Sequence, residues 1–163
     1  MLSPNFFYEY LYMSLNDILY TYREADKEDW PIFYDAYLSN AAIPINKIRF
    51  KDIFENYLLD RLMLVFIFEK EATKSIVGGT ILKKSNELFN ENSFVEIQHL
   101  HILSKYRRLN AATQLYAFIE EIAKDNKATK IMVSCNLNST LNQRFYLRNK
   151  FVFSKKIYQK NIE

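Results

Sequence analysis

The sequence predicts a mixed α/β (α+β) fold in which helices flank one central, mostly antiparallel sheet. The chain has 163 residues, enough for one compact domain. Its apolar residues follow the twofold period of strands and the 3.6-residue period of helices in turn. The predicted element order is β-α-α-β-β-β-α-β-α-β. Consecutive middle strands favour antiparallel pairing, and a later crossover helix adds a parallel pair.

A strand and two helices are expected to open the fold. Residues 18–22 alternate weakly, as a strand does, and the acidic stretch 26–29 then marks the start of a helix. The apolar residues of this first helix share one face: Trp30, Phe33, Tyr34, Tyr37 and Leu38. Residues 39–47 form a loop. A second amphipathic helix follows with Phe50, Ile53, Phe54, Tyr57 and Leu58.

Strands dominate the middle of the chain, and helices return after it. The expected strands cover residues 62–68, 75–84 and 94–103, separated by a turn and a loop. The later elements are a helix from Asn110, a short buried strand over 131–135, a helix over 139–148, and a strand or minimal hairpin over 151–162.

The two glycines and the single cysteine limit the turns and the covalent or metal sites that this chain can form. The two glycines, Gly78 and Gly79, are adjacent within a predicted strand and indicate a bulge, a close backbone approach or a simple bend. Tight turns are therefore expected to use mostly Asn, Asp and Ser. Cys135 is the single cysteine, which excludes an intrachain disulfide and a thiolate zinc site, and no metal is expected.

Two segments at the ends of the chain have distinct compositions. Residues 1–17 form an aromatic lead-in that we expect to pack on the domain or on a partner, while 18–163 form the single domain. Residues 127–163 contain eight basic residues and one acidic residue, which suits a phosphate-bearing ligand, an acidic partner or a solvated surface. Apolar runs are too short for a membrane span and no secretory signal is recognised, so we expect a cytoplasmic protein without membrane contact.

The segment 94–124 carries the most chemical information. A buried strand runs through 104–110 into a helix, and the free N–H groups at a helix start bind phosphate. Arg107 and Arg108 add fixed positive charge just before that helix.

This segment resembles the acetyl-CoA-binding motif of the GNAT acetyltransferase superfamily. In that motif an apolar strand is followed by Tyr-Arg and then by Arg/Gln-x-x-Gly-x-Gly/Ala, which opens a helix. Tyr106-Arg107 and the run from Arg107 to Ala112 stand in those places. Asn110 replaces the first glycine of the pyrophosphate loop, and asparagine adopts positive φ more readily than other non-glycine residues. Ala112 at the second position is a known variant.

A second family motif resembles the end of the chain. The family pattern Asn-x-x-Ala-x-x-Phe-Tyr, followed by Gly-Phe, matches Asn138, Phe145-Tyr146 and Lys150-Phe151, with lysine in the place of the glycine. The resemblance covers the chain from about Ile18 onward. The predicted element order is also that of the family, so the resemblance implies a GNAT-like fold.

The resemblance implies an N-acetyltransferase that moves the acetyl group of acetyl-CoA to a primary amine by direct attack in a ternary complex. The acceptor is a small molecule or a protein, and a homodimer is a possible assembly. Glu96 stands at the place of the general base, His99 is an alternative base, and Tyr146 matches the general acid. The implied acetyl-CoA contacts are Leu100, His101, Ile102, Arg107, Arg108, Leu109, Asn110, Ala111, Ala112, Thr113 and Asn138.

Several alternatives stay open at this point. Glu96 could be a surface residue and Tyr146 a core aromatic. A catalytically silent GNAT-fold module that binds CoA or a protein competes with the enzyme. The basic end of the chain alone supports a nucleic-acid binder, and no nucleic-acid motif is present, so nucleic acid is not an expected partner. His99 and His101 would share a face of a regular strand, but two imidazoles alone make a poor metal site.

Overall fold

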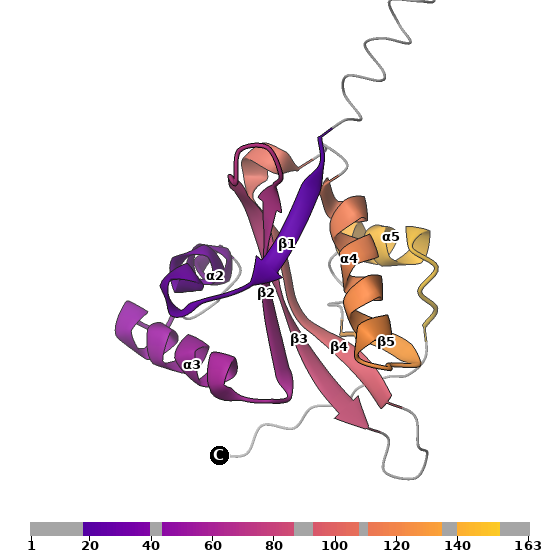
Figure 1. The fold of residues 1–163 in the computed structure, drawn as a ribbon, viewed down its shortest axis with the longest axis horizontal. Coiled ribbons are helices and arrows are strands. Elements are labelled where there is room, and N and C mark those ends of the chain that lie inside the picture. Colours follow the sequence, from indigo (N-terminus) through magenta and orange to yellow (C-terminus); the bar gives the residue numbers. More distant parts are fainter. Residues whose placement is uncertain (1–17, 40–43, 87–92, 108–110, 135–139, 154–163) are drawn as a thin grey trace, which may run out of the picture. The chain divides into compact units, whose positions relative to one another are not determined.

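The computed structural model describes residues 18–39, 44–86, 93–107, 111–134 and 140–153. The chain divides into two compact units, residues 1–133 and residues 134–163. The first unit contains the whole sheet and most helices, and the second contains one helix, α5 (Thr140–Arg148). Figure 1 shows these elements.

Five strands form one sheet in the order in which they occur along the chain. The strands are β1 (Tyr20–Glu24), β2 (Met63–Lys70), β3 (Ile76–Asn86), β4 (Ser93–Ile102) and β5 (Lys130–Val133). The pairs β1–β2, β2–β3 and β3–β4 are antiparallel, whereas β4 and β5 are parallel. The prediction of a mixed, mostly antiparallel sheet is thus confirmed.

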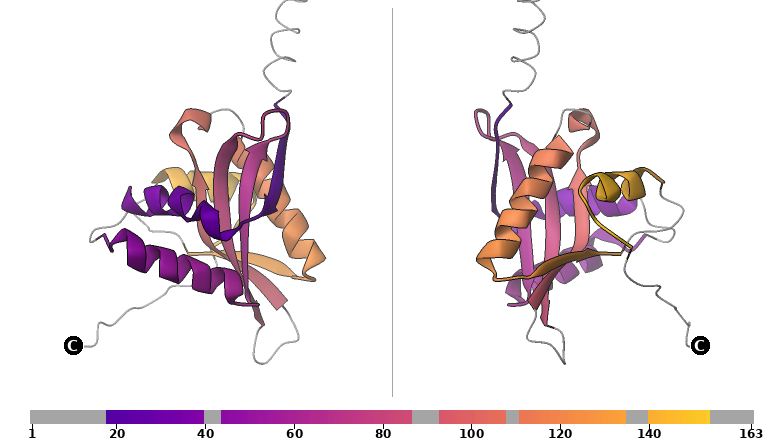
Figure 2. Two further views of the ribbon diagram at one scale, coloured as in Figure 1. Left: turned by 60° about the vertical axis from the view of Figure 1, so that its left-hand side comes forward. Right: turned by 90° about the vertical axis from the view of Figure 1, so that its right-hand side faces the viewer.

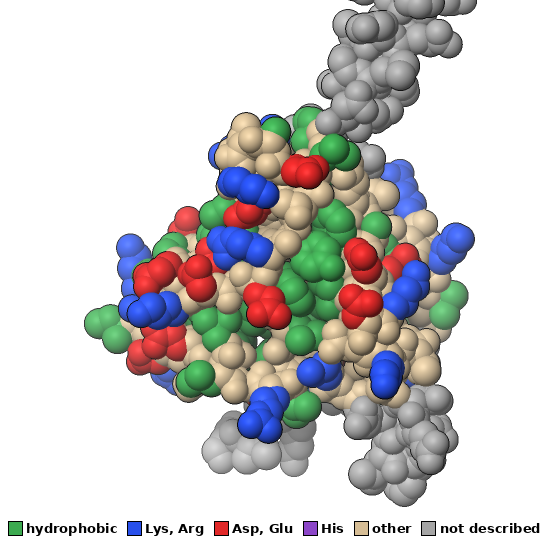
Figure 3. All heavy atoms as spheres, in the orientation of Figure 1, with side chains coloured by type: hydrophobic (Ala, Val, Ile, Leu, Met, Phe, Trp, Pro, Cys, Tyr) green, Lys and Arg blue, Asp and Glu red, His purple; other side chains and the backbone are tan. Residues whose placement is uncertain are grey.

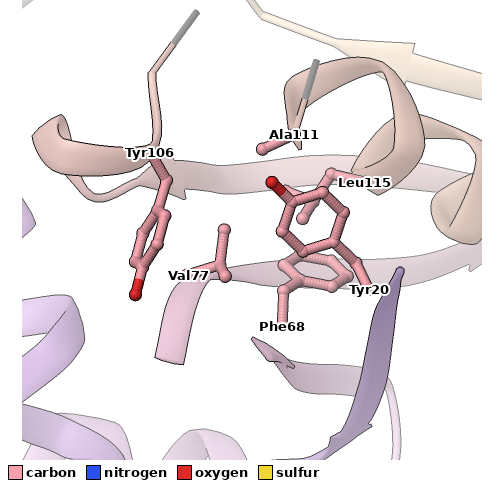
Figure 4. Packing of buried hydrophobic residues seen from close by; sticks show 6 residues of the cluster. All are labelled: Tyr20, Phe68, Val77, Tyr106, Ala111 and Leu115. Carbon is pink, nitrogen blue, oxygen red and sulfur yellow. The ribbon is translucent and has the colours of Figure 1, made fainter. Parts of the chain in front are cut away.

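Helices of the first unit cover both faces of this sheet (Figures 1 and 2). These helices are η1 (Lys27–Asp29), α2 (Trp30–Leu38), α3 (Lys47–Leu59), η2 (Ser104–Tyr106) and α4 (Ala111–Asp125). Under α2 and α3 lies a core of Phe33, Phe54, Val65, Ile67 and Ile81. Under α4 lies a second core, shown in Figure 4, of Tyr20, Phe68, Val77, Tyr106, Ala111 and Leu115. Because the middle of β2 is buried on both faces, residues 63–68 of this strand form an unbroken apolar run.

Local signals place the helix starts. The Asp26 carboxylate accepts the Glu28 N–H at 2.9 Å, and the Asp26 N–H donates to Asp29 at 2.9 Å, which makes a capping box for η1. Pro31 lies in the first turn of α2, where a missing N–H costs nothing. The Asn46 side chain accepts the Arg49 N–H at 2.9 Å and caps α3.

An ion network joins β1, η1 and β2. Arg23 donates to both carboxylate oxygens of Asp29, at 2.7 and 2.9 Å, and its Nε donates to Glu69 at 2.8 Å. Both acidic residues are buried. Burial alone would raise the pKa of Asp29, but hydrogen bonds from Arg23 and from the Asp26 N–H outweigh it and hold that pKa below its ordinary value.

Three lysines hold left-handed backbone positions: Lys74, Lys127 and Lys150, with φ of 53°, 57° and 64°. The expectation that Asn, Asp and Ser would make the tight turns is wrong at these places. Lys127 ends α4, where its N–H donates to the Lys124 carbonyl at 2.8 Å and the Ala128 N–H donates to the Ala123 carbonyl at 2.9 Å. This pair of hydrogen bonds is a Schellman motif, in which glycine is the usual residue at the left-handed position held here by Lys127.

The second unit repeats this motif at the end of α5. The Lys150 N–H donates to the Leu147 carbonyl and the Phe151 N–H to the Tyr146 carbonyl, both at 3.1 Å. The rings of Phe151 and Tyr146 meet at 5.2 Å and supply the apolar contact that accompanies such caps. Lys150 stands where the family motif has glycine, and its positive φ is a conformation that glycine adopts more readily than lysine.

Element boundaries differ from the predictions by a few residues. β1 begins at Tyr20 rather than at residue 18, and β2 continues to Lys70, into the first two residues of the turn predicted at 69–74. The predicted final strand is not found over residues 151–153, which are neither helix nor strand. Its remainder, the lead-in 1–17 and the polar loop at 88–92 lie outside the described residues.

Candidate functional site

A bulge in β4 shapes the face that carries the predicted bases. Ile81 pairs with His99, but the next residue of β3, Leu82, pairs with Ile97. Gln98 is therefore an extra residue of β4, and its side chain is exposed.

The bulge places Glu96 on the same face as the two histidines. Directly paired residues of antiparallel strands project to one face, and alternate residues of β3 share a face. The alternate β3 residues Gly79, Ile81 and Lys83 pair with His101, His99 and Glu96. In a regular strand, residues three apart would lie on opposite faces. The predicted common face of His99 and His101 is confirmed, with their ring centroids 6.1 Å apart.

His99 is enclosed on this face. Its ring lies 5.8 Å from the ring of Phe33 on α2, and its carbonyl oxygen accepts the Thr80 hydroxyl at 2.8 Å. Its Nε2 is buried, and no described residue bonds to it. Burial, and then the neighbouring His101, lower the pKa of His99 to about 4, so the imidazole is neutral near pH 7.

The glycine pair marks a close backbone approach, one of the three readings of the sequence. A Cβ on Gly79 would lie 2.7 Å from Cζ of Phe33, and a Cβ on Gly78 would overlap the His101 carbonyl oxygen. Gly79 thus allows Phe33 to reach the strand beside His99. A register shift between Phe68 and Glu69 of the partner strand also lies next to Gly78. The roles of Phe33 and Thr80 were not predicted, and the glycine pair was the signal that pointed there.

His101 lies among fixed charges. Burial, and then Arg107, lower its pKa, while Asp35 opposes them. The Arg107 side chain is anchored, because its Nε donates to the Ile102 carbonyl at 3.2 Å. The predicted base Glu96 is only half-buried and pairs in register with Lys83 of β3 and Met132 of β5.

One edge of β4 is free beyond Ile97. β5 pairs with β4 only from Phe94 to Ile97, so in the described part of the chain no strand lies along the outer edge of residues 98–102. Unpaired N–H and C=O groups on such an edge accept an extended ligand. The strand then leads through η2 and Arg107 to the start of α4. This edge includes Leu100, His101 and Ile102, of which the Ile102 carbonyl already accepts the Arg107 Nε–H.

Apart from Leu100 and Ile102, the predicted site residues fall into four groups. The first unit brings together Glu96, His99 and His101, with Arg107 beside them. Ala111, Ala112 and Thr113 form the first turn of α4, and Ala111 is fully buried. Arg108, Leu109, Asn110 and Asn138 lie outside the described residues. Tyr146 belongs to the second unit, where its ring contacts Phe145 at 5.3 Å.

The described residues lack two further features, a metal-binding cluster and a membrane-spanning helix. They contain no group of three or more His, Cys, Asp or Glu side chains that could hold a metal ion. None of the helices described here has the length and apolar character needed to cross a membrane.

Comparison with known proteins identifies a family. The family description "Acetyltransferase (GNAT) family" matches residues 19–151. No curated protein matches the sequence significantly.

Solved structures share the fold at low sequence identity. A structure titled as a possible acetyltransferase from Clostridium difficile 630 has a TM-score of 0.76 at 16% identity, over 89% of this chain and 99% of that one. A GNAT family acetyltransferase from Staphylococcus aureus has a TM-score of 0.69 at 16% identity, over 88% and 98%. Glucosamine-6-phosphate N-acetyltransferase from Arabidopsis thaliana has a TM-score of 0.65 at 15% identity, over 89% and 99%.

Proposed function

The chain belongs to the acetyltransferase (GNAT) family, and from this premise we propose that it transfers the acetyl group of acetyl-CoA to a primary amine. The observation that carries the proposal is the face of β4 that presents Glu96 and His99 beside a free strand edge. Direct attack by the amine, with both substrates bound, needs such a base next to the donor.

The described residues fit a donor that combines an extended amide arm with phosphates. The free edge at Leu100–Ile102 offers backbone groups to the amides of the arm. Arg107 and the first turn of α4, with Ala112 and Thr113, offer positive charge and free N–H groups to phosphate. Acetyl-CoA would supply an activated thioester there. The contacts of Arg108, Leu109, Asn110 and Asn138 remain part of the proposal.

Glu96 is the proposed base. A lysine-like amine has a pKa of about 10.4 and must lose a proton before it attacks. The pKa of His99, at about 4, makes this imidazole a weaker base than an ordinary histidine. Glu96 stands at the place of the family's general base and is only half-buried, so we assign the proton to Glu96, directly or through water, and keep His99 as the alternative. The Nε2 of His99 is buried, which leaves Glu96 as the more accessible of the two groups.

Tyr146 is the proposed acid that protonates the leaving thiolate. The support for this role is the match of Phe145-Tyr146 to the family motif. The acceptor is a small amine or an amine of a protein, and a cytoplasmic location and a homodimer stay predictions. The competing function is a silent module that binds CoA, favoured by the lysine at the family's glycine position.

Calorimetric titration with acetyl-CoA tests the donor site. Wild-type protein should bind acetyl-CoA, and Arg107→Ala should weaken binding about tenfold because a charged contact to phosphate is lost. The exposed Lys51→Ala on α3 is the matched control and should bind as wild type. Absence of binding would remove both the enzyme and the CoA-binding module. Binding without transfer to any amine of a broad panel would favour the silent module.

A further inference from the structure

We propose that the aromatic segment of residues 1–17 docks on an apolar surface between β1 and α4 of its own chain. This surface, the β1–α4 patch, consists of the half-buried Tyr22 and Phe118, together with the buried Phe66 that Tyr22 contacts. It lies wholly within the first unit. The inference does not depend on the proposed acetyl transfer, because none of these residues belongs to the proposed site.

Three connected rings make the patch. The ring of Tyr22 meets Phe66 at 5.5 Å and 85°, and Phe118 at 5.0 Å and 53°. Tyr22 and Phe118 are only half-buried. Figure 3 shows hydrophobic side chains gathered between β1 and α4, with acidic side chains beside them. Connected apolar surface of this kind marks a contact site more often than a single exposed ring does.

The segment joins the fold at one end of the patch. Gln114, Phe118, Glu121 and Asp125 follow one another at three- and four-residue spacing, so they form a stripe along α4. The Gln114 side chain donates to the Ile18 carbonyl at 3.4 Å, and Phe118 packs on Tyr22. The stripe on α4 therefore runs alongside β1, starting beside Ile18. Ile18 is the residue to which the segment of residues 1–17 is covalently joined.

β1 also offers a free edge. It is an outer strand that pairs with β2 alone among the described strands. An outer strand exposes unpaired N–H and C=O groups that a further extended segment can satisfy. Residues 1–17 are rich in aromatic side chains, and Ser14, Asn16 and Asp17 are residues that favour a reversal of the chain just before β1.

Length and covalent tethering favour residues 1–17 as the occupant of the patch. Seventeen residues extend to about 60 Å at about 3.5 Å each, whereas the stripe from Gln114 to Asp125 is about 16 Å long. Tethering raises the effective concentration of the segment to the millimolar range.

The acidic border of the patch favours a basic partner instead. Burial, and then Glu121 and Asp125, raise the pKa of Tyr22, so both carboxylates act on the patch. Residues 1–17 contain no Lys or Arg. Exposed ion pairs contribute little to binding because both partners lose hydration and salt weakens their attraction, whereas burial of aromatic surface is not screened by salt. The tethered aromatic segment is therefore the stronger candidate.

Paramagnetic broadening tests the docking in the full chain. A nitroxide is attached at Asn5→Cys in a Cys135→Ser background, so that it has one attachment site. We expect amide signals of β1 and of residues 114–125 to lose most of their intensity, and those of α3 to keep theirs. Replacing Tyr22→Ser should restore the lost signals. The half-exposed Tyr57→Ser on α3 is the matched control and should leave the broadening unchanged.

Each other outcome would overturn the proposal. Signals that keep their intensity throughout would show that the segment does not dock. Broadening centred on α3 would place it elsewhere. Broadening seen when nitroxide-bearing chains are mixed with isotope-labelled chains that carry no nitroxide would make a second copy the occupant. Shifts of the patch signals by an oligolysine peptide, without broadening from the segment, would assign the patch to a basic partner. Dispersed amide spectra check that each variant is folded.

Discussion

The ring of Phe33 on α2 lies 5.8 Å from the ring of His99 on β4, in space that Gly79 leaves open. One contact thus joins the helix layer, the glycine of β3 and a predicted base. It also encloses His99 and so contributes to the burial that lowers the pKa of this imidazole.

Gly79→Ala should destabilise the fold through this contact. The added Cβ would lie 2.7 Å from Cζ of Phe33 and 3.1 Å from the Phe66 carbonyl oxygen, so the helix or the strand must shift. Overpacking of this kind costs about 1–3 kcal/mol of unfolding free energy, measurable in urea. The second change Phe33→Leu should recover part of the loss. Exposed Lys83→Ala on the same strand is the control, and an equal loss there would contradict the steric account.

Acid should weaken the fold through His99 well above pH 4. The folded pKa is about 4, whereas an unfolded histidine has a pKa near 6.5. Between these values the unfolded chain binds more protons, so the unfolding free energy falls as the pH is lowered from about 6.5 to 4. The difference is worth at most about 3 kcal/mol. Urea unfolding at several pH values measures it, and His99→Gln should flatten the profile. An imidazole that titrates near 6.5 by NMR would contradict the enclosure of His99.

Arg23→Met should be strongly destabilising. The change leaves Asp29 and Glu69 buried without their cation, and such a loss costs about 3 kcal/mol or more. Adding Asp29→Asn and Glu69→Gln should recover much of it. Because the folded pKa of Asp29 is lowered, its contribution is present above about pH 4 and is lost only at lower pH, below the range of His99. Lys51→Met, in an exposed ion pair, should change stability by less than about 0.5 kcal/mol.

Glycine should stabilise the chain at two of the left-handed lysines. Glycine removes the cost of the left-handed conformation, which stabilises the folded state by about 1–2 kcal/mol. Glycine also makes the unfolded chain more flexible, which lowers the unfolding free energy by about 0.4–1 kcal/mol. Lys127→Gly and Lys150→Gly should each raise the unfolding free energy by about 0.5–1 kcal/mol. Lys127→Val should lower it, because a β-branched residue resists positive φ. If glycine at either position gave no gain in a denaturant titration, the backbone assignment there would be wrong.

Periodicity and alternation predicted the fold well. The double burial of β2 left a continuous apolar run, and the face of α2 with Phe33 showed a clear helical spacing, so both elements were found within a few residues. Turn chemistry was predicted less well. Lysine has no preference for positive φ, so nothing in the residue itself marks Lys74, Lys127 or Lys150 as turn positions.

The residues of the candidate site were proposed from the sequence, but their arrangement could not be. Glu96 was named from its place in a family motif and His99 as a histidine of the same predicted strand, yet three-residue spacing on a regular strand puts two side chains on opposite faces. The insertion of Gln98 joins them, and a bulge depends on the pairing of two strands distant in sequence. The free edge of β4 has the same origin, because it depends on how short β5 is.

Release of CoA thiol from acetyl-CoA in the presence of a primary amine tests the proposed transfer most directly. Wild-type protein should release thiol only when an amine is added, and Glu96→Gln should slow release about 10²-fold near pH 7. The loss should shrink toward pH 9–10, where more of the amine is neutral without help. His99→Gln should have a smaller effect. Thiol release that never depends on the amine would contradict the transfer, and full activity of Glu96→Gln with loss in His99→Gln would move the base to His99.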